Sequence, residues 1–224
     1  MVLAVLLAPL AVSAQTVIEW PAGSVLAPVQ LAMLGGPDNF FSSAEIDDAM
    51  FERIDGVSFG RGCTTPRKDL RCLHLLHRNF AGQTQVGEMI CNKAIADDLL
   101  AIFRELYDAG YPIEKIFLVD EYDGNDERSM ADNNTSCFNF RTKPGMKQLS
   151  RHALGMAVDI NPLYNPYVKG VHVEPAAGKP YADRSRKCKY FIKSGDLCHR
   201  AFARRGFTWG GSWRSSQDYQ HFEK

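Results

Sequence analysis

The residues best suited to chemistry gather in the C-terminal half of the chain. His152, Asp159 and His221 offer two imidazoles and a carboxylate, and a catalytic zinc ion usually takes three protein ligands of these types and keeps a fourth position for water. Gly155 and Ala157 lie between the first two, and such small residues let the backbone turn tightly enough to bring both ligands to one ion. We therefore expect these three residues to bind one zinc ion.

The surrounding residues extend this into a longer pattern. Residues 150–159 read Ser-x-His-x-x-Gly-x-Ala-x-Asp, and residues 218–221 read Asp-x-x-His. In this order and spacing the sequence resembles the zinc D-alanyl-D-alanine carboxypeptidases and L-alanyl-D-glutamate endopeptidases related to VanY. The resemblance continues through residues 161–167 and 206–211, and it covers the chain from Leu70 to the C-terminus.

The resemblance implies a fold, a reaction and a set of site residues. The fold would be α+β, a small antiparallel sheet with flanking helices like the hedgehog N-terminal domain. The reaction would be zinc-dependent hydrolysis of amide bonds next to D-amino acids in peptidoglycan stem peptides. His152, Asp159 and His221 match the metal ligands of the family, and Asp218 matches its general base. Related D-alanyl-D-alanine dipeptidases have Glu at this place, so the shorter Asp would have to approach more closely.

A cation is also expected near the scissile carbonyl, because hydrolysis passes through an anionic tetrahedral intermediate. The family places such a residue on the strand before the first ligand, and Arg141 is the candidate here. Relatives often read Ser-Gly-Tyr-Arg where residues 136–139 read Ser-Cys-Phe-Asn, so Asn139 stands in the place of their arginine. Both residues would alternate onto one face of a strand, and either could reach the carbonyl. An ion pair of Arg141 with the acidic loop is the structural alternative.

Three functions fit these residues. A D-alanyl-D-alanine carboxypeptidase is the preferred one, and an L-alanyl-D-glutamate endopeptidase would use the same metal centre on another bond. A non-catalytic zinc-containing binding module is the third, since a fold does not by itself imply an activity. Asp218 argues against that module, which has no need of an acid beside its last ligand. A carboxypeptidase also needs a cation for the substrate carboxylate, for which the candidates are Arg128, Arg151, Arg184 and Arg214.

The other histidines have structural interpretations. His74 and His77 form an HxxH without a neighbouring Glu, on a predicted strand where residues three apart face opposite sides. His172 and His199 lack other potential ligands nearby in the sequence.

Near the motifs, a few residues keep two interpretations. Trp209 and Trp213 either line the substrate cleft or pack in the core. Ser150 either hydrogen-bonds near the zinc ion or caps the turn before His152. A calcium loop is not expected in the acidic stretch after Asp120, because the glycine falls at the wrong place for an EF-hand.

The elements that would position these residues are irregularly mixed, which favours an α+β fold over a regular α/β alternation. Ser42 and Ser43 are candidate N-caps for a first helix, and Asn92 caps the clearest helix, which Gly110 ends. We expect strands at residues 70–80, 84–91, 115–119, 136–141 and 158–160, helices at 45–54, 92–110 and 196–205, and a solvated loop at 120–134.

Composition excludes some partners. The chain has 224 residues with 26 basic and 26 acidic side chains, so no net charge attracts nucleic acid, and no stretch is long enough for a stable membrane span. Six cysteines are compatible with disulfides in an exported protein. The pair Cys188 and Cys198 is expected to join across a short loop, and Cys91 is expected in the core. The number of subunits is left open.

An N-terminal export signal is expected. An apolar run ends in Val12-Ser13-Ala14, a small-x-small pattern that signal peptidase reads, although no basic residue precedes it. We therefore predict a signal peptide over residues 1–14, an N-terminal extension over 15–69 packed on the rest, and a zinc peptidase domain over 70–224. The mature protein would be periplasmic or secreted.

Overall fold

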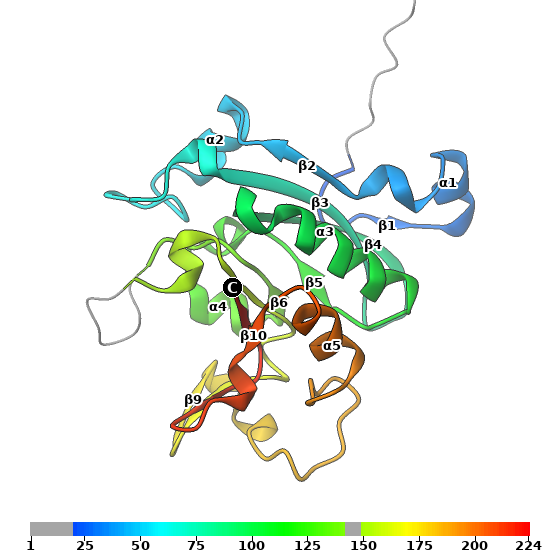
Figure 1. Cartoon of the computed structure of the whole chain (residues 1–224). Helices are drawn as coiled ribbons and strands as arrows, with labels where there is room; N and C mark the ends of the chain where they lie inside the picture. The colour runs from blue at the N-terminus through cyan, green and yellow to red at the C-terminus, as the bar shows by residue number, and fades with distance from the viewer. Residues whose placement is uncertain (1–19, 142–148) are drawn as a thin grey trace, which may run out of the picture.

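The computed structural model describes residues 20–141 and 149–224, and Figure 1 shows their arrangement. The strands are β1 (Val25–Leu26), β2 (Ser42–Glu45), β3 (Leu70–Arg78), β4 (Thr84–Asn92), β5 (Lys115–Ile116), β6 (Asn134–Thr135), β7 (Ala157–Asp159), β8 (Tyr167–Lys169), β9 (His172–Glu174), β10 (Thr208–Trp209), β11 (Gln217–Asp218) and β12 (His221–Glu223). The α-helices are α1 (Pro28–Met33), α2 (Asp48–Ile54), α3 (Lys93–Asp108), α4 (Asp126–Ala131) and α5 (Leu197–Ala203). The expected signal peptide at 1–14 lies outside the described residues.

Several small sheets make up the β structure. The largest has the order β1-β4-β3-β2, and two three-stranded sheets have the orders β10-β12-β7 and β11-β8-β9. All of their pairings are antiparallel, while β5 and β6 form a parallel pair. Helices pack beside these sheets and do not alternate regularly with the strands. The expected α+β fold with antiparallel sheets and flanking helices is therefore confirmed.

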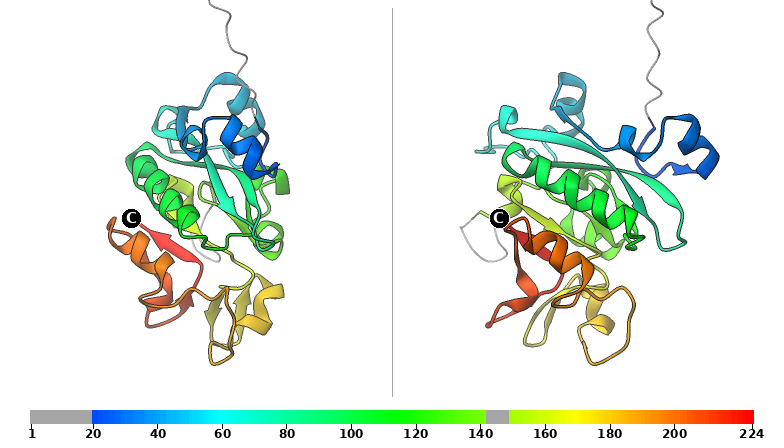
Figure 2. Two further views of the ribbon diagram at one scale, coloured as in Figure 1. Left: turned by 90° about the vertical axis from the view of Figure 1, so that its right-hand side faces the viewer. Right: turned by 45° about the vertical axis from the view of Figure 1, so that its right-hand side comes forward.

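The long hairpin of β3 and β4 carries α3 on one face, as Figure 2 shows. Side chains alternate between the faces of a strand, and those of Leu73, Leu75 and Met89 join the buried core that α3 also lines. Asn92 ends β4 and starts the helix, since its side chain accepts from the Ala94 amide. Both strands and this helix lie where the sequence predicted them, within two residues at each end.

The same core extends to the C-terminal sheets. Phe202 of α5 stacks on Phe222 of β12 with ring centroids 4.2 Å apart, and Ile160 after β7 is fully buried in the same cluster. In Figure 1 these sheets and α5 lie below β3 and α3. One continuous apolar core thus connects the long hairpin to the strands that carry the candidate site.

Four predicted elements differ from the structure. The first helix starts at Asp48, where Asp47 caps it by accepting from the Met50 amide, because residues 42–45 pair with β3 as a strand instead. Strand β5 ends at Ile116. The acidic stretch 120–134 is not a loop, since it contains α4 and ends in β6. Residues 136–141 form only one bridge, Ser136 to Asp159, so the predicted strand there is wrong.

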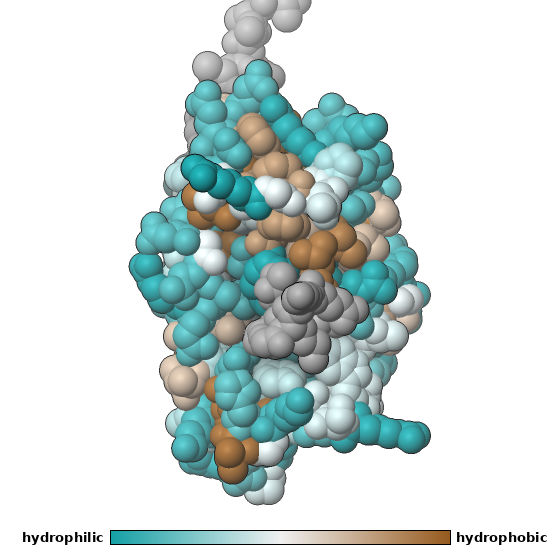
Figure 3. Space-filling model, turned by 90° about the vertical axis from the view of Figure 1, so that its left-hand side faces the viewer, coloured by the Kyte–Doolittle hydropathy of each residue, from teal (hydrophilic) through white to brown (hydrophobic). Residues whose placement is uncertain are grey.

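The N-terminal part contributes directly to the main sheet, because β1 pairs with β4 and β2 pairs with β3. The domain boundary at residue 70 stays a prediction. On the outside, hydrophilic side chains cover most of the face in Figure 3, with apolar ones in patches between them. Within the described part of the chain, no helix is long and apolar enough to cross a membrane.

The cysteines correct one expectation. All six lie in the described part of the chain as free thiols, so the expected Cys188–Cys198 disulfide is not formed. Cys198 is fully buried on α5 within the core, whereas Cys188 lies half-buried in the preceding loop. Short sequence separation did not bring the two together, because helix packing directs Cys198 inward. Cys91 is a core residue as expected.

Candidate metal centre and active site

Strand pairing places two of the three expected ligands opposite each other. Strands β7 and β12 are antiparallel, and Asp159 and His221 are direct partners in their register. Directly opposed residues project to the same face of a sheet. The His221 Nδ1 and the Asp159 Oδ1 are consequently 3.0 Å apart.

The third residue comes from a short 3-10 helix, η4 (Arg151–Leu154). Ser150 caps it, since its hydroxyl accepts from the His152 amide at 3.2 Å, which supports the capping interpretation of this serine. Gly155 ends the helix with φ +64°, a left-handed conformation that glycine adopts without strain. A Cβ there would also lie 2.6 Å from the Asn92 nitrogen. The tight turn expected at Gly155 is therefore required twice, by its conformation and by its close packing on β4.

Hydrogen bonds orient the lone pairs of the two imidazoles. The His152 Nδ1 is 2.6 Å from the Cys137 carbonyl oxygen, and because a carbonyl only accepts, this nitrogen carries the proton. The His152 Nε2 faces the other two donors, since His221 Nδ1 and Asp159 Oδ2 are each 3.2 Å away. On the far side of the other ring, His221 Nε2 lies 3.2 Å from the Glu223 carboxylate.

These contacts suit a cation. The ligand atoms of His152, Asp159 and His221 all lie within 4.8 Å of one another and are buried. Their separations of 3.0 to 3.2 Å are a few tenths of an ångström below the roughly 3.4 Å between donors about 2.1 Å from a tetrahedral zinc ion. Carbonyl and carboxylate partners on the outer ring nitrogens are typical of metal-binding histidines. The residues present therefore fit a metal ion, and the three expected ligands are brought together.

The electrostatics of the trio show how strongly its members interact. Burial works against the charged form of His221, but the hydrogen bonds to Asp159 and Glu223 outweigh burial and raise its pKa to about 10. Burial likewise disfavours ionised Asp159, but His152 and His221 hold the pKa of this carboxyl well below its ordinary value. The carboxylates thus favour a positive charge at this place, and a bound cation would supply one.

Asp218 lies beside this trio at the end of β11, where it pairs with Tyr167 of β8. It faces the same cavity, but its Oδ1 is buried and has no hydrogen-bond partner among the described residues. Desolvation raises the pKa of this carboxyl to about 7, with a further contribution from the charge of Asp159. Gly210 permits this close packing, since a Cβ there would lie 2.8 Å from the Asp218 Cβ.

Of the two candidates for contact with the scissile carbonyl, Arg141 and Asn139, only Arg141 lines the cavity. Arg141 lines the cavity with the trio, and its guanidinium pairs with Asp126 of α4 at 2.6 Å. Asn139 is buried outside this lining, with its amide nitrogen directed at the Gly124 carbonyl 3.5 Å away. Arg141 therefore faces the cavity, and the ion pair that was its structural alternative is present as well.

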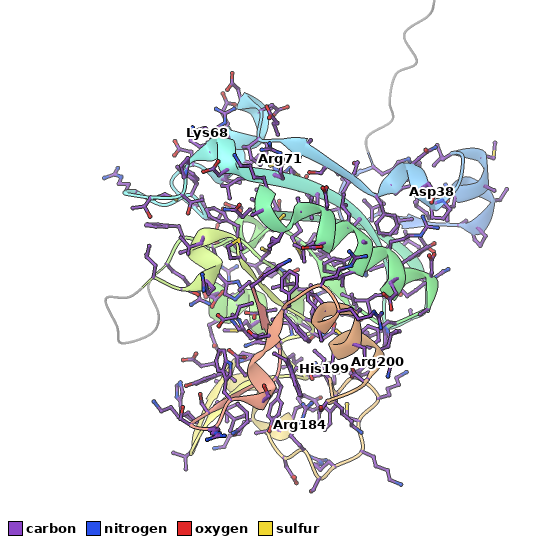
Figure 4. The ribbon with its side chains drawn as sticks, viewed as in Figure 1. Asp38, Lys68, Arg71, Arg184, His199 and Arg200 are labelled. Atoms are coloured by element: carbon purple, nitrogen blue, oxygen red, sulfur yellow. The ribbon has the colours of Figure 1, made fainter. Side chains whose placement is uncertain are left out.

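The cavity has a volume of about 430 Å³ and contains two further cations, Arg151 and Lys169. Among the described residues, neither has an acidic partner. Of the other candidates for the substrate carboxylate, Arg128 pairs with Asp123, and Arg214 does not line the cavity. Arg184 is half-buried in the lower part of the molecule (Figure 4) and donates to the Tyr164 and Ile192 carbonyls.

Sequence reasoning missed the β8–β9 hairpin, which forms one wall of the cavity. Its residues Lys169 and His172 line the site, whereas His172 had a purely structural interpretation. This histidine pairs with Glu174 at 2.8 Å. The closeness of the hairpin to the trio depends on the pairing of β8 with β11, and no local sequence signal announces that pairing.

Of the two tryptophans, one lines the cavity and the other packs in the core. Trp213 lines the cavity and packs on the His221 ring with centroids 5.4 Å apart. Trp209 belongs to the core and donates from its ring nitrogen to the Tyr219 carbonyl. His199 packs against Trp209, and His77 is buried against the Ile113 carbonyl. Both of these histidines have the structural positions expected for them.

Comparison with known proteins supports the inferred resemblance. Residues 144–224 match a family model described as D-alanyl-D-alanine carboxypeptidase. No curated protein and no solved structure gave a match. The matched range contains His152, Asp159, Asp218 and His221, so it includes the trio and the neighbouring acid. The resemblance is therefore confirmed over residues 144–224, which are similar to the D-alanyl-D-alanine carboxypeptidase family of metallopeptidases.

Proposed function

We propose that this protein is a zinc-dependent D-alanyl-D-alanine carboxypeptidase that acts on peptidoglycan stem peptides. The observation that carries the proposal is the convergence of the His152, Asp159 and His221 donor atoms within 4.8 Å of one another, in a cavity that Asp218 and Arg141 also line. A buried carboxyl oxygen without a partner costs stability. Its presence at Asp218 is explained if this group performs chemistry.

Each residue then has a defined task. A zinc ion held by the trio would supply Lewis acidity and make water at the site easier to deprotonate. Asp218 would accept a proton from the attacking water and deliver it to the departing amine, and a carboxyl whose pKa lies near 7 suits both steps at neutral pH. Arg141, held by Asp126, would donate to the oxygen on which negative charge develops.

The unpaired cations support the carboxypeptidase assignment. A substrate ending in D-alanine has a free carboxylate, and charge-assisted hydrogen bonds to such a group are among the stronger polar contacts. Arg151 and Lys169 line the cavity and have no acidic partner among the described residues. An L-alanyl-D-glutamate endopeptidase would cut inside the peptide, where these cations would instead meet side-chain carboxylates.

The test of the reaction is mass spectrometry of purified muropeptides after incubation with the protein. Loss of one terminal D-alanine is the expected result, whereas cleavage after L-alanine would assign the endopeptidase activity instead. Intact muropeptides after incubation with zinc-loaded protein would refute both enzymatic assignments and favour a binding module.

The test of the carboxylate contact compares Arg151→Gln and Lys169→Gln with Arg214→Gln, an exposed residue outside the cavity lining. The first two should lower kcat/KM for peptides with a free C-terminus by roughly tenfold or more, as for a lost hydrogen bond to a charge. Arg214→Gln should leave it unchanged. Equal rates on C-terminally amidated and free peptides would argue against the carboxypeptidase assignment.

The test of the metal is elemental analysis of His152→Ala and His221→Ala. Each variant should lose the ion of this site, because only two of three ligands would remain. His172→Ala, in the same cavity, should retain it. We also propose that the protein is exported, which predicts that mature material begins at Gln15, as N-terminal sequencing can check.

A further inference from the structure

A second cluster of metal-binding side chains lies on the long hairpin, outside the catalytic cavity. Cys72, His74 and Glu88 place a thiol, an imidazole and a carboxylate within 4.8 Å of one another. None of the three lines the cavity around His152. Figure 4 labels Arg71, the residue before Cys72, in the upper part of the molecule, and the sheet of β10, β12 and β7 lies below it in Figure 1.

Strand geometry explains the cluster. Cys72 and His74 are two residues apart on β3 and therefore project to the same face. Glu88 of β4 is the direct partner of His74 in the register. Its Oε1 lies 3.8 Å from the Cys72 Sγ and 3.8 Å from the His74 Nε2. One carboxylate oxygen thus faces both other donors.

These separations are close to those of a coordination sphere. For a tetrahedral zinc ion with bonds of about 2.3 Å to sulfur and about 2.1 Å to nitrogen and oxygen, sulfur and oxygen lie roughly 3.6 Å apart and nitrogen and oxygen roughly 3.4 Å. The observed distances of 3.8 Å exceed these by a few tenths of an ångström. Small side-chain rotations would close that difference without moving the strands.

Two of the three side chains of the cluster are buried, and the third is partly exposed to solvent. Cys72 and Glu88 are 3% and 8% exposed, while the His74 side chain is 40% exposed. Arg53 pairs with both oxygens of Glu88, with a shorter contact of 2.8 Å to Oε2 and a longer one of 3.2 Å to Oε1. An ion can therefore enter past His74 and meet a carboxylate whose orientation is already fixed, as outer partners commonly do for metal ligands.

From this geometry we propose that Cys72, His74 and Glu88 form a second metal site, for a thiophilic divalent cation such as Zn²⁺, that ties β3 to β4. Thiolate and imidazole donors select zinc-like ions over magnesium or calcium. Binding replaces the thiol proton of Cys72 with the metal bond and releases that proton to solvent. The fourth position faces solvent beside His74. The site is independent of the catalytic proposal.

Cobalt substitution of the full chain tests the site. A cobalt–thiolate bond gives a charge-transfer band in the near ultraviolet, and the trio of His152, Asp159 and His221 contains no thiol. We expect the metal-free protein to take up two Co²⁺ ions, one of which produces this band. His152→Ala should bind one ion fewer and keep the band.

Matched variants locate the thiol. Cys72→Ser should lose the band, whereas Cys91→Ser, a buried cysteine of the same hairpin that belongs to the α3 side of the core, should keep it. His74→Gln changes a partly exposed side chain, so the fold should survive, and it should weaken cobalt binding at the band-producing site at least tenfold. A parent protein without the band, a band that survives Cys72→Ser, or unchanged affinity in His74→Gln would each overturn the proposal.

Discussion

Replacing Asp218 with asparagine separates chemistry from stability, because the two effects should have opposite signs. The amide has the same shape but carries no charge and cannot serve as a base. Turnover of zinc-loaded protein should fall roughly 100- to 10,000-fold, the usual contribution of a positioned general base. Metal content should not change, since Asp218 is not one of the three convergent donors.

The expected gain in stability follows from the pKa shift. Burial raises the pKa of Asp218 from 3.8 to about 7, so between these values the folded protein binds a proton that the unfolded chain has released. The free energy of unfolding therefore falls as the pH rises from about 4 to about 7 and stays low above it. For a carboxyl fully shielded from water, this pKa shift would lower the free energy of unfolding above pH 7 by about 4 kcal/mol. Because Asp218 lines an open cavity, water screens part of this cost, and we expect Asp218→Asn to gain about 2 kcal/mol at pH 8.

Urea denaturation of metal-free protein measures this gain, at pH 8 and at pH 4, with Asp97→Asn on the exposed face of α3 as the control. At pH 4 the variant and the parent should differ little, and the control should resemble the parent at both values. Parental turnover in Asp218→Asn would refute the assignment of the base. Loss of the metal would show that Asp218 supports the ligands, and a destabilised variant at pH 8 would refute the argument from burial.

Three further outcomes are expected. Gly155→Ala should destabilise the fold by at least about 2 kcal/mol more than Gly110→Ala. Both glycines have positive φ, but only at Gly155 would a Cβ lie 2.6 Å from the Asn92 nitrogen. The melting temperatures of the two variants measure the difference. Burial lowers the pKa of His77 from 6.5 to about 4, so the contribution of this residue to the unfolding free energy should fall by about 3 kcal/mol as the pH drops from 6.5 to 4. A urea series should show the parent losing this much stability relative to His77→Gln over that range. Thiol titration of denatured, unreduced protein should count six free thiols, and a count of four would restore one disulfide.

Local sequence patterns sufficed for the elements whose stability is local. The hairpin of β3 and β4 follows from two apolar runs with a polar turn between them, and α3 follows from its helical periodicity, the Asn92 cap and Gly110. The prediction that a helix includes residues 45–47 was wrong for the opposite reason. Residues 42–45 gain more from pairing with β3 as a strand, and no local propensity reveals a partner more than 25 residues away.

The residues of the candidate site likewise fall into those that the sequence indicated and those that only the structure placed. The sequence by itself indicated the trio, because a metal centre limits both the residue types and their order, and this limit is visible as a spaced pattern. The family resemblance added Asp218 as the candidate base. Only the tertiary structure decided that Arg141 and not Asn139 faces the cavity and that Lys169 joins it. It also decided that Cys198 is buried as a free thiol. The physical reason is that cavity access and burial depend on packing between segments distant in the chain, which residue spacing along one segment does not encode.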